Sequence, residues 1–174
     1  ADSGAEIIVC NTYHLYLRPG HRRVQELGGL ARFSGWNRPI LTDSGGFQVY
    51  SLADLTRVND DGAEFQSHVD GSRHTFTPEL VVQVQEALGS DIAMCLDQCP
   101  PFPVSRSLAE EAVERTTLWA ERTREAQQPG SNVFGIVQGA TWPDLRRRGA
   151  EELVRLGFAG YALGGLCLGE PSAL

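Results

Sequence analysis

Four apolar segments of the chain each run into a polar side chain or a glycine pair. These positions are Asp43, Asp97, Gln138 and Gly164-Gly165. Together, two carboxylates, an amide and glycine N–H groups suit the edge of a purine: a carboxylate accepts from adjacent N–H and amino donors of guanine, and an amide or backbone N–H donates to its carbonyl oxygen. Taken singly, each also suits a loop cap or a turn. The base-binding hypothesis therefore requires the four positions to converge.

The first of these positions lies in residues 40–48, ILTDSGGFQ. Gly45 and Gly46 have no Cβ, so their backbone N–H groups could approach a flat or anionic ligand closely. Phe47 offers a face for stacking. A tight turn beside a solvated Asp is the alternative, because one glycine pair after a strand is a weak signal. The chain has no Lys, and none of the four motifs contains Arg, which argues against an anionic ligand.

Length and composition indicate one globular domain: 174 residues, 41% hydrophobic and 21% charged. The net charge is -7 and all 15 basic residues are Arg, so no basic arm for nucleic acid is evident. No membrane segment or signal peptide is evident, which predicts a cytoplasmic protein. The four cysteines lack metal-site spacing and are expected to be reduced core thiols; they are Cys10, Cys95, Cys99 and Cys167.

Strand and helix patterns alternate along the chain. Expected strands are residues 6–10, 40–43, 92–96, 132–137 and 160–163. Expected helices lie within residues 21–27, 77–89, 107–129 and 143–156. Thr77-Pro78 and a capping box at Ser107 mark two helix starts, and residues 11–20 are expected to form a loop. Two Asp-Gly turns predict an antiparallel hairpin inserted at about residues 56–76.

This alternation is typical of a parallel α/β protein, for which two architectures compete. The length favours a five-stranded doubly wound sheet, because a complete β/α barrel needs about 250 residues. Polar residues after four successive strands favour a barrel, which builds its site from several strand ends. We therefore predict an incomplete (β/α)8 TIM barrel with an inserted hairpin. Such an arc leaves strand edges and apolar surface uncovered, so the chain is expected to be part of a larger protein.

Several collinear motifs resemble the tRNA-guanine transglycosylases. They are NTYHLYLRPG (11–20), TDSGGFQVYSL (42–52), SHVDGSRHTFTPE (67–79), LGSDIAMCLDQC (88–99), FGIVQGA (134–140) and GYALGGLCLGE (160–170). The resemblance covers essentially the whole chain. It implies a β/α barrel enzyme, expected as a homodimer, that exchanges guanine at the wobble position of tRNA for 7-aminomethyl-7-deazaguanine, the precursor of queuosine.

The resemblance also implies roles for individual residues. Asp43 is similar to the acid/base residue of the family, and Asp97 to the carboxylate that binds the guanine edge. Glu170 matches an acidic residue near the substituent-binding end of the pocket, and Cys99 a pocket wall. The remaining residues expected to bind the base are Ser44, Gly45, Gly46, Phe47, Gln138, Gly165 and Leu166.

The chain departs from the family pattern in two features. The family's nucleophilic Asp and its structural Zn²⁺ site, C-x-C-x-x-C with a later His, lie beyond the last strand of this sequence. Residues 1–174 would thus be a partial catalytic barrel without its C-terminal part or zinc subdomain. We expect no metal ligands in this chain and no base exchange by it alone. Leu168 is similar to the bulky aliphatic residue of bacterial members, which favours the small aminomethyl precursor.

Three alternatives remain at the level of the sequence. The chain could be a non-catalytic subunit or RNA-binding relative of the family, although Asp43, Asp97 and Gln138 are intact. It could belong to an archaeal-type enzyme acting at another tRNA site, or to an unrelated doubly wound protein. The acidic balance suits tRNA binding poorly, since phosphate contacts need cations. Residues 146–148, three arginines, are expected to form a solvated helix face.

Overall fold

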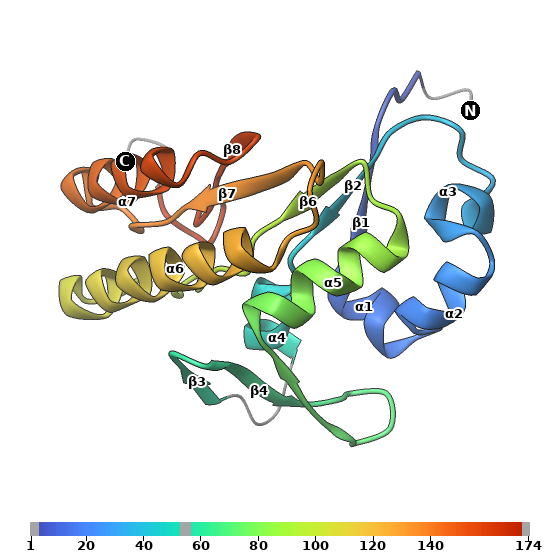
Figure 1. The fold of residues 1–174 in the computed structure, drawn as a ribbon. Helices are drawn as coiled ribbons and strands as arrows, with labels where there is room; N and C mark the ends of the chain where they lie inside the picture. The colour runs from blue at the N-terminus through green and yellow to red at the C-terminus, as the bar shows by residue number, and fades with distance from the viewer. Residues whose placement is uncertain (1–3, 53–56, 172–174) are drawn as a thin grey trace.

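The computed structural model describes residues 4–52 and 57–171 (Figure 1). Five parallel strands form the main sheet: β1 (Ile8–Asn11), β2 (Ile40–Asp43), β6 (Ile92–Met94), β7 (Val133–Val137) and β8 (Gly160–Leu163). Their order in space is β1-β2-β6-β7-β8, the order of the chain. A doubly wound sheet reverses its order at a switch point, so that alternative is wrong. The sequential order is consistent with part of a β/α barrel.

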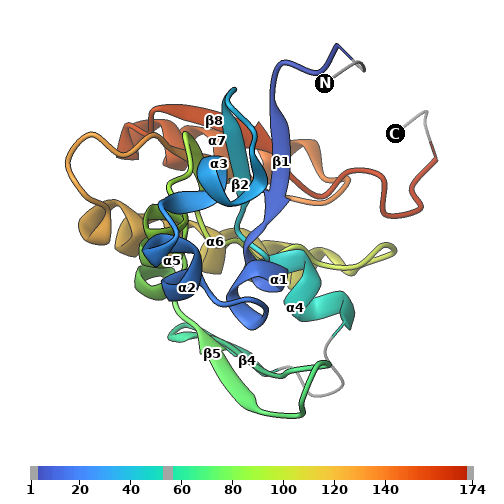
Figure 2. The same ribbon diagram turned by 90° about the vertical axis from the view of Figure 1, so that its right-hand side faces the viewer.

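The main helices form one layer beside this sheet (Figures 1 and 2). Helix α2 (His21–Glu26) packs on α5 (Pro78–Leu88), α5 on α6 (Arg106–Ala126), and α6 on α7 (Pro143–Leu156). Apolar side chains fill the space between sheet and helices. Representative core residues are Val24, Ile40, Val82, Val84, Ala93, Ala120, Val133 and Leu153.

The edge strands expose apolar side chains, as expected of an open arc. Val9 in β1 is 66% exposed and Leu163 in β8 is 70% exposed. Within the described residues the sheet is therefore open at both edges, and its core is complete only on the helix side. None of the helices described in residues 4–52 and 57–171 has both the length and the apolar character needed to cross a membrane.

Helix ends follow local sequence signals, with one correction. Thr77 caps α5 by accepting from the Leu80 N–H, and Gly89 ends that helix at φ +73°, both as predicted. Helix α6 starts earlier than the predicted capping box at Ser107. Ser105 is its cap, because the Ser105 side chain accepts from the Leu108 N–H.

Three short helices are missing from the sequence prediction. Residues 11–20 were expected to be a loop, but α1 (Thr12–Leu17) forms after the Asn11 side chain accepts from the His14 N–H. Helix α3 (Gly29–Ser34) follows the predicted helix end, and α4 (Gly46–Leu52) starts at the second glycine of the Gly45-Gly46 pair. Only Gly45 has a positive φ, +79°, so the pair marks a helix start rather than a simple turn.

Strand boundaries differ from the prediction by up to two residues. Strand β1 was expected over residues 6–10, but covers Ile8–Asn11. Strand β6 was expected over residues 92–96, but ends at Met94, so residues 95–97 continue beyond the C-terminal end of the sheet. The four cysteines are free, as expected; Cys95 is buried, but Cys167 is exposed and is not a core thiol.

The predicted hairpin is a three-stranded antiparallel sheet. Strands β3 (Arg57–Asn59), β4 (Gly62–Gln66) and β5 (Arg73–Phe76) lie in the order β3-β4-β5. Both Asp-Gly sequences lie at turns, so each turn joins a pair of strands and the hairpin prediction was one strand short. The start of the predicted insertion, at about residue 56, lies outside the described residues.

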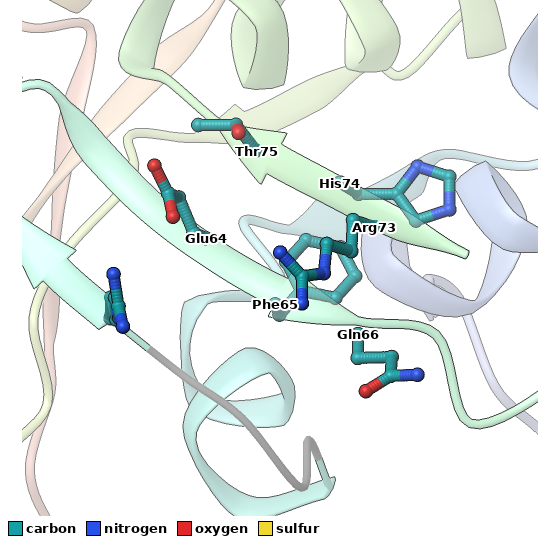
Figure 3. Close-up of a pocket in the computed structure, with 7 residues that line it drawn as sticks. Glu64, Phe65, Gln66, Arg73, His74 and Thr75 are labelled. Atoms are coloured by element: carbon teal, nitrogen blue, oxygen red, sulfur yellow. The ribbon is translucent and has the colours of Figure 1, made fainter. Parts of the chain in front are cut away.

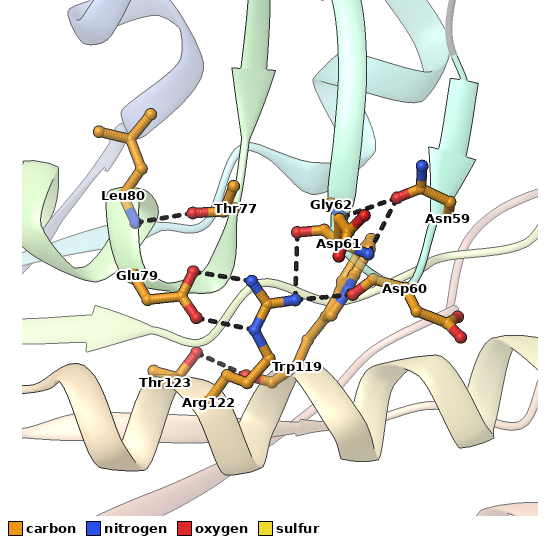
Figure 4. Close-up of polar contacts among 10 residues, drawn as sticks. All are labelled: Asn59, Asp60, Asp61, Gly62, Thr77, Glu79, Leu80, Trp119, Arg122 and Thr123. Atoms are coloured by element: carbon orange, nitrogen blue, oxygen red, sulfur yellow. Dashed lines mark hydrogen bonds and ion pairs between the residues drawn. The ribbon is translucent and has the colours of Figure 1, made fainter.

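Arg122 of α6 anchors this small sheet to the helix layer (Figure 4). Its Nε and Nη2 atoms donate to the two carboxylate oxygens of Glu79, at 2.7 and 2.9 Å. Its Nη1 atom donates to the backbone carbonyls of Asp60 at 2.6 Å and Asp61 at 3.1 Å, in the turn between β3 and β4. Trp119 Nε1 also donates to the Asp60 carbonyl, at 3.0 Å. One guanidinium therefore joins α5, α6 and the β3–β4 turn.

Candidate functional site

One open cavity of about 400 Å³ lies at the C-terminal ends of β2, β6, β7 and β8. It brings together seven of the predicted site residues: Asp43, Ser44, Phe47, Asp97, Gln138, Gly165 and Leu166. Cys99, Leu168, Met94 and Ile136 also line it. The predicted convergence of four strand ends is confirmed. Phe47 and Leu166 are 44% and 52% exposed, so they offer apolar surface at the open side of the cavity.

Asp97 lines the cavity and is 8% exposed. It accepts hydrogen bonds from Gln138 Nε2 at 2.7 Å and from Ser44 Oγ at 3.1 Å. Burial raises the pKa of Asp97 to about 6, and repulsion by Asp43 adds to this rise, while the two hydrogen bonds oppose it. Among the described ion pairs, none includes Asp97. A ligand with N–H donors could therefore stabilise this carboxylate.

Gln138 has an unsatisfied acceptor in the same place. Its side chain is 2% exposed, and its Oε1 atom has no hydrogen-bond partner in the structure. A Cβ added to Gly164 would lie 2.4 Å from Gln138 Nε2, and one added to Gly165 would lie 2.8 Å from Oε1. The two glycines thus let the chain after β8 pass directly over the Gln138 amide. A buried acceptor without a donor is costly, which makes a ligand donor favourable here.

Asp43 is held by its neighbours and by the adjacent strand. Its Oδ1 atom accepts from the Gly45 N–H at 2.6 Å, and its Oδ2 atom from Asn11 Nδ2 at 2.8 Å. Burial raises the pKa of Asp43 despite these hydrogen bonds. Asn11 was not predicted as a site residue. A polar residue at the C-terminal end of a strand, the signal used for the other strands, could have identified it. Asn11 ends β1 and pairs in register with Asp43.

Gly45 and Gly46 lie beside the cavity rather than in its lining. Their N–H groups, expected to face a ligand, instead donate to Asp43 Oδ1 and Ser44 Oγ. A Cβ on Gly45 would lie 2.8 Å from the Tyr13 backbone nitrogen, and one on Gly46 would lie 2.7 Å from the Asp97 carbonyl oxygen. The glycines are needed because the loop packs tightly on α1 and on the segment after β6. They position Asp43 and Ser44.

Glu170 shapes the loop that follows β8. Its carboxylate accepts from the Cys167 N–H at 2.5 Å and from the Leu168 N–H at 2.8 Å. Hydrogen bonds from backbone N–H groups lower the pKa of Glu170. Glu170 is therefore engaged with the loop backbone. Cys99 also lines the cavity, and burial raises the pKa of its thiol to about 11, which keeps the thiol neutral at pH 7.

The described residues contain no group of three or more His, Cys, Asp and Glu that could hold a metal ion. The Zn²⁺ implied by the family resemblance therefore finds no ligand set in this part of the chain.

A second cavity, of about 490 Å³, opens on the outer face of the three-stranded sheet (Figure 3). Its lining comes from all three strands and comprises Arg57, Glu64, Phe65, Gln66, Arg73, His74 and Thr75. None of the predicted site residues belongs to this lining. The polar residues at the strand ends and this outer face are thus separate features.

Comparison with known proteins decides the family. A family model described as queuine tRNA-ribosyltransferase matches residues 1–174. The chain belongs to the queuine tRNA-ribosyltransferase family. The queuine tRNA-ribosyltransferases of Desulforudis audaxviator and Pelotomaculum thermopropionicum are 61% and 58% identical to the chain, over 99% of its length. Each alignment covers 47% of the relative, so the chain spans about half the length of these curated relatives. The strand-end cavity is the candidate site within this shared half.

Proposed function

We propose that this chain is the base-binding part of a tRNA-guanine transglycosylase. In the proposed reaction the whole protein exchanges guanine at the wobble position of tRNA for 7-aminomethyl-7-deazaguanine. The observation that carries the proposal is the shared cavity, in which Asp97 has no cationic partner among the described residues and Gln138 Oε1 lacks a donor. Membership of the family supports the same reaction.

The donors and acceptors of the cavity suit guanine. The Asp97 carboxylate can accept from the adjacent ring N–H and amino group, which would also stabilise its charged form. Backbone N–H groups at Gly165 and Leu166 can donate to the carbonyl oxygen of the base. Gln138 can offer both a donor and an acceptor. Phe47 supplies an aromatic face at the mouth of the cavity.

The proposed chemistry is a double displacement at the anomeric carbon of the ribose. The target nucleotide first leaves the base stack. A carboxylate nucleophile, proposed to lie in the half of the protein outside this chain, forms a bond to the anomeric carbon as the bond to guanine breaks. The incoming base then displaces this carboxylate. Asp43 is proposed to donate a proton to the leaving base and to accept one from the incoming base.

Further features of the whole protein follow from the same proposal. The parallel strands would be part of a (β/α)8 barrel completed by the other half, with Zn²⁺ ligands also outside this chain. The whole protein would act as a homodimer on tRNA. Leu168 lines the cavity beside the Glu170-bound loop, and its bulk favours the small aminomethyl base over queuine, as in bacterial-type enzymes.

Labelled-guanine exchange with the full-length protein tests the proposal. We expect label to enter tRNA with the full-length protein but not with residues 1–174 alone. Absence of exchange by a folded, tRNA-binding full-length protein would favour the non-catalytic alternative. Exchange at a position other than the wobble base would favour the archaeal-type alternative, and exchange by the isolated chain would show that the nucleophile lies within it.

A further inference from the structure

Arg146 on α7 connects the loops that follow β7 and β8. Its Nη1 atom donates to the backbone carbonyl of Ala140 at 3.2 Å and to that of Gly164 at 3.1 Å. The three consecutive arginines were expected to form a solvated face, and Arg146 contradicts this because it is half-buried and bonded to the site loops. Among the ion pairs of the described residues, Arg148 has three acidic partners and Arg146 has none.

The loop after β7 is built to lie against Arg146. A Cβ on Gly139 would lie 2.6 Å from the Arg146 backbone nitrogen and 2.8 Å from its Cγ, so only glycine fits at this approach. The next residue, Ala140, has φ +48°, which is uncommon for a residue with a side chain. Its carbonyl is one of the two that accept from Arg146. The guanidinium thus stabilises a loop conformation that is unfavourable in isolation.

The second carbonyl, that of Gly164, controls the direction of the next N–H group. The peptide bond between Gly164 and Gly165 is trans, so the carbonyl of the first residue and the N–H of the second point in opposite directions. Arg146 holds the carbonyl on the α7 side. Gly165 itself lines the cavity. Its N–H group, opposite to the carbonyl that Arg146 holds, is therefore directed toward the cavity.

We propose that Arg146 is a positioning residue for base binding: by holding the Gly164 carbonyl, its guanidinium directs the Gly165 N–H toward the carbonyl oxygen of a bound purine. This inference rests on the proposed function of the cavity. Arg146 itself does not line the cavity, so it acts through the peptide that it holds. Its loss should weaken guanine binding while the proton-transfer residue Asp43 stays in place.

The test compares substitutions at Arg146 with one at its neighbour in the full-length protein. R146M removes the donors but keeps much of the aliphatic stem, R146K keeps a cation with different geometry, and R147M removes a charge from the exposed residue next in the chain. Equilibrium binding of guanine is measured by calorimetry, and KM and kcat by guanine exchange. For R146M we expect Kd and KM to rise about tenfold with kcat within about twofold, because the contact acts on bound base in ground and transition states alike.

R146K should recover part of the guanine affinity but remain several-fold weaker than wild type, and R147M should match wild type. Guanine binding by both Arg146 variants at wild-type strength would overturn the role, as would an equal loss in R147M. If R146M does not fold, R146K alone decides, since unchanged affinity there contradicts the need for the guanidinium. Wild-type protein that neither binds nor exchanges guanine would instead contradict the proposed function.

Discussion

Carboxylates at two places in the molecule have opposite surroundings. Glu79, where the three-stranded sheet meets the helix layer, receives two hydrogen bonds from Arg122. Burial acts to raise the pKa of Glu79, but hydrogen bonds, chiefly from Arg122, together lower it. Asp97, at the strand ends, receives hydrogen bonds only from neutral side chains, and burial raises its pKa to about 6. One carboxylate is charge-compensated by the fold, and the other is not.

This difference distinguishes the structural contact between Arg122 and Glu79 from the candidate binding site at the strand ends. Burying a carboxylate without a cation is unfavourable, and such groups concentrate where function requires them. The unsatisfied Oε1 of Gln138 lies in the same cavity. Asp97 therefore lacks a cationic partner and Gln138 Oε1 lacks a hydrogen-bond donor, whereas Arg122 supplies both charge and donors to Glu79. Substitutions should therefore affect stability at the contact between Arg122 and Glu79, and binding or chemistry at the strand ends. Four predictions test this division.

D43N in the full-length protein should have the largest effect. Removing a general acid/base group lowers the rate of guanine exchange by about 100-fold to 10,000-fold. The measurement is kcat for exchange, with melting temperature as a check on folding. D61N, in the exposed β3–β4 turn, is the control and should retain full exchange. A loss of less than tenfold in D43N would assign proton transfer to another group.

R122M should destabilise the protein by about 2–3 kcal/mol, because a charged group loses its hydrogen bonds to Glu79 and to two carbonyls. Urea unfolding measures the free energy change. Guanine affinity of the folded variant should equal that of wild type. E79Q should destabilise the protein less than R122M does. The stability change of the double variant should differ from the sum of the two single changes, because the two residues are in contact. Unchanged stability of R122M would contradict the structural role of Arg122. Weakened guanine binding by the folded variant would contradict its separation from the strand-end cavity.

D97N should become more stable relative to wild type as the pH rises. Since folding raises the pKa of Asp97 from its ordinary value to about 6, the folded state holds the proton more tightly. Wild-type stability from this group is then complete below about pH 4 and falls as pH rises to about 6. Relative to wild type, D97N should gain up to about 3 kcal/mol between pH 4 and pH 7.5.

Urea unfolding of both proteins at these two pH values checks this change in relative stability. Guanine binding by D97N should be lost at both pH values, because the acceptor for two donors is replaced. A stability difference between D97N and wild type that does not vary with pH would show that the negative charge of Asp97 is compensated by other groups in the whole protein, so that its pKa is not raised.

R106Q should have the smallest effect. Arg106 pairs with Asp144, but both side chains are about half exposed, at 48% and 60%. Exposed ion pairs contribute little to stability, so the melting temperature should shift by no more than about 2 °C. Stabilisation by Arg122 depends instead on partial burial and on four hydrogen bonds. An equal loss of stability in R106Q and R122M would show that burial and the additional hydrogen bonds of Arg122 make no difference to the stabilisation.

Much of the fold and site follows from local sequence signals. Apolar segments ending in Asp43, Asp97 and Gln138 predicted one cavity, because parallel strands bring their C-terminal ends to the same side of a sheet. The Thr77 cap and Gly89 fixed the ends of α5 for similar local reasons. The short helices α1 and α4 were missed because each depends on a cap or a glycine pair that equally suits a loop. The third strand of the small sheet was missed because two turns were interpreted as one hairpin.

Other features depend on tertiary contacts that leave no local pattern. Gly45 and Gly46 were expected to present N–H groups to a ligand, but their neighbours Asp43 and Ser44 accept from them. Arg146 belongs to a run of three arginines, and only the packing of α7 against two loops distinguishes it from Arg147. Asn11 was identifiable in principle, since it ends β1 beside Asp43.

The most direct test is a crystal structure of the full-length protein with guanine bound. We predict that the base lies in the strand-end cavity, with its ring N–H and amino group within hydrogen-bond distance of Asp97 and its carbonyl oxygen near the Gly165 N–H. Guanine bound elsewhere, for example on the outer face of the three-stranded sheet, with the strand-end cavity empty, would contradict the account.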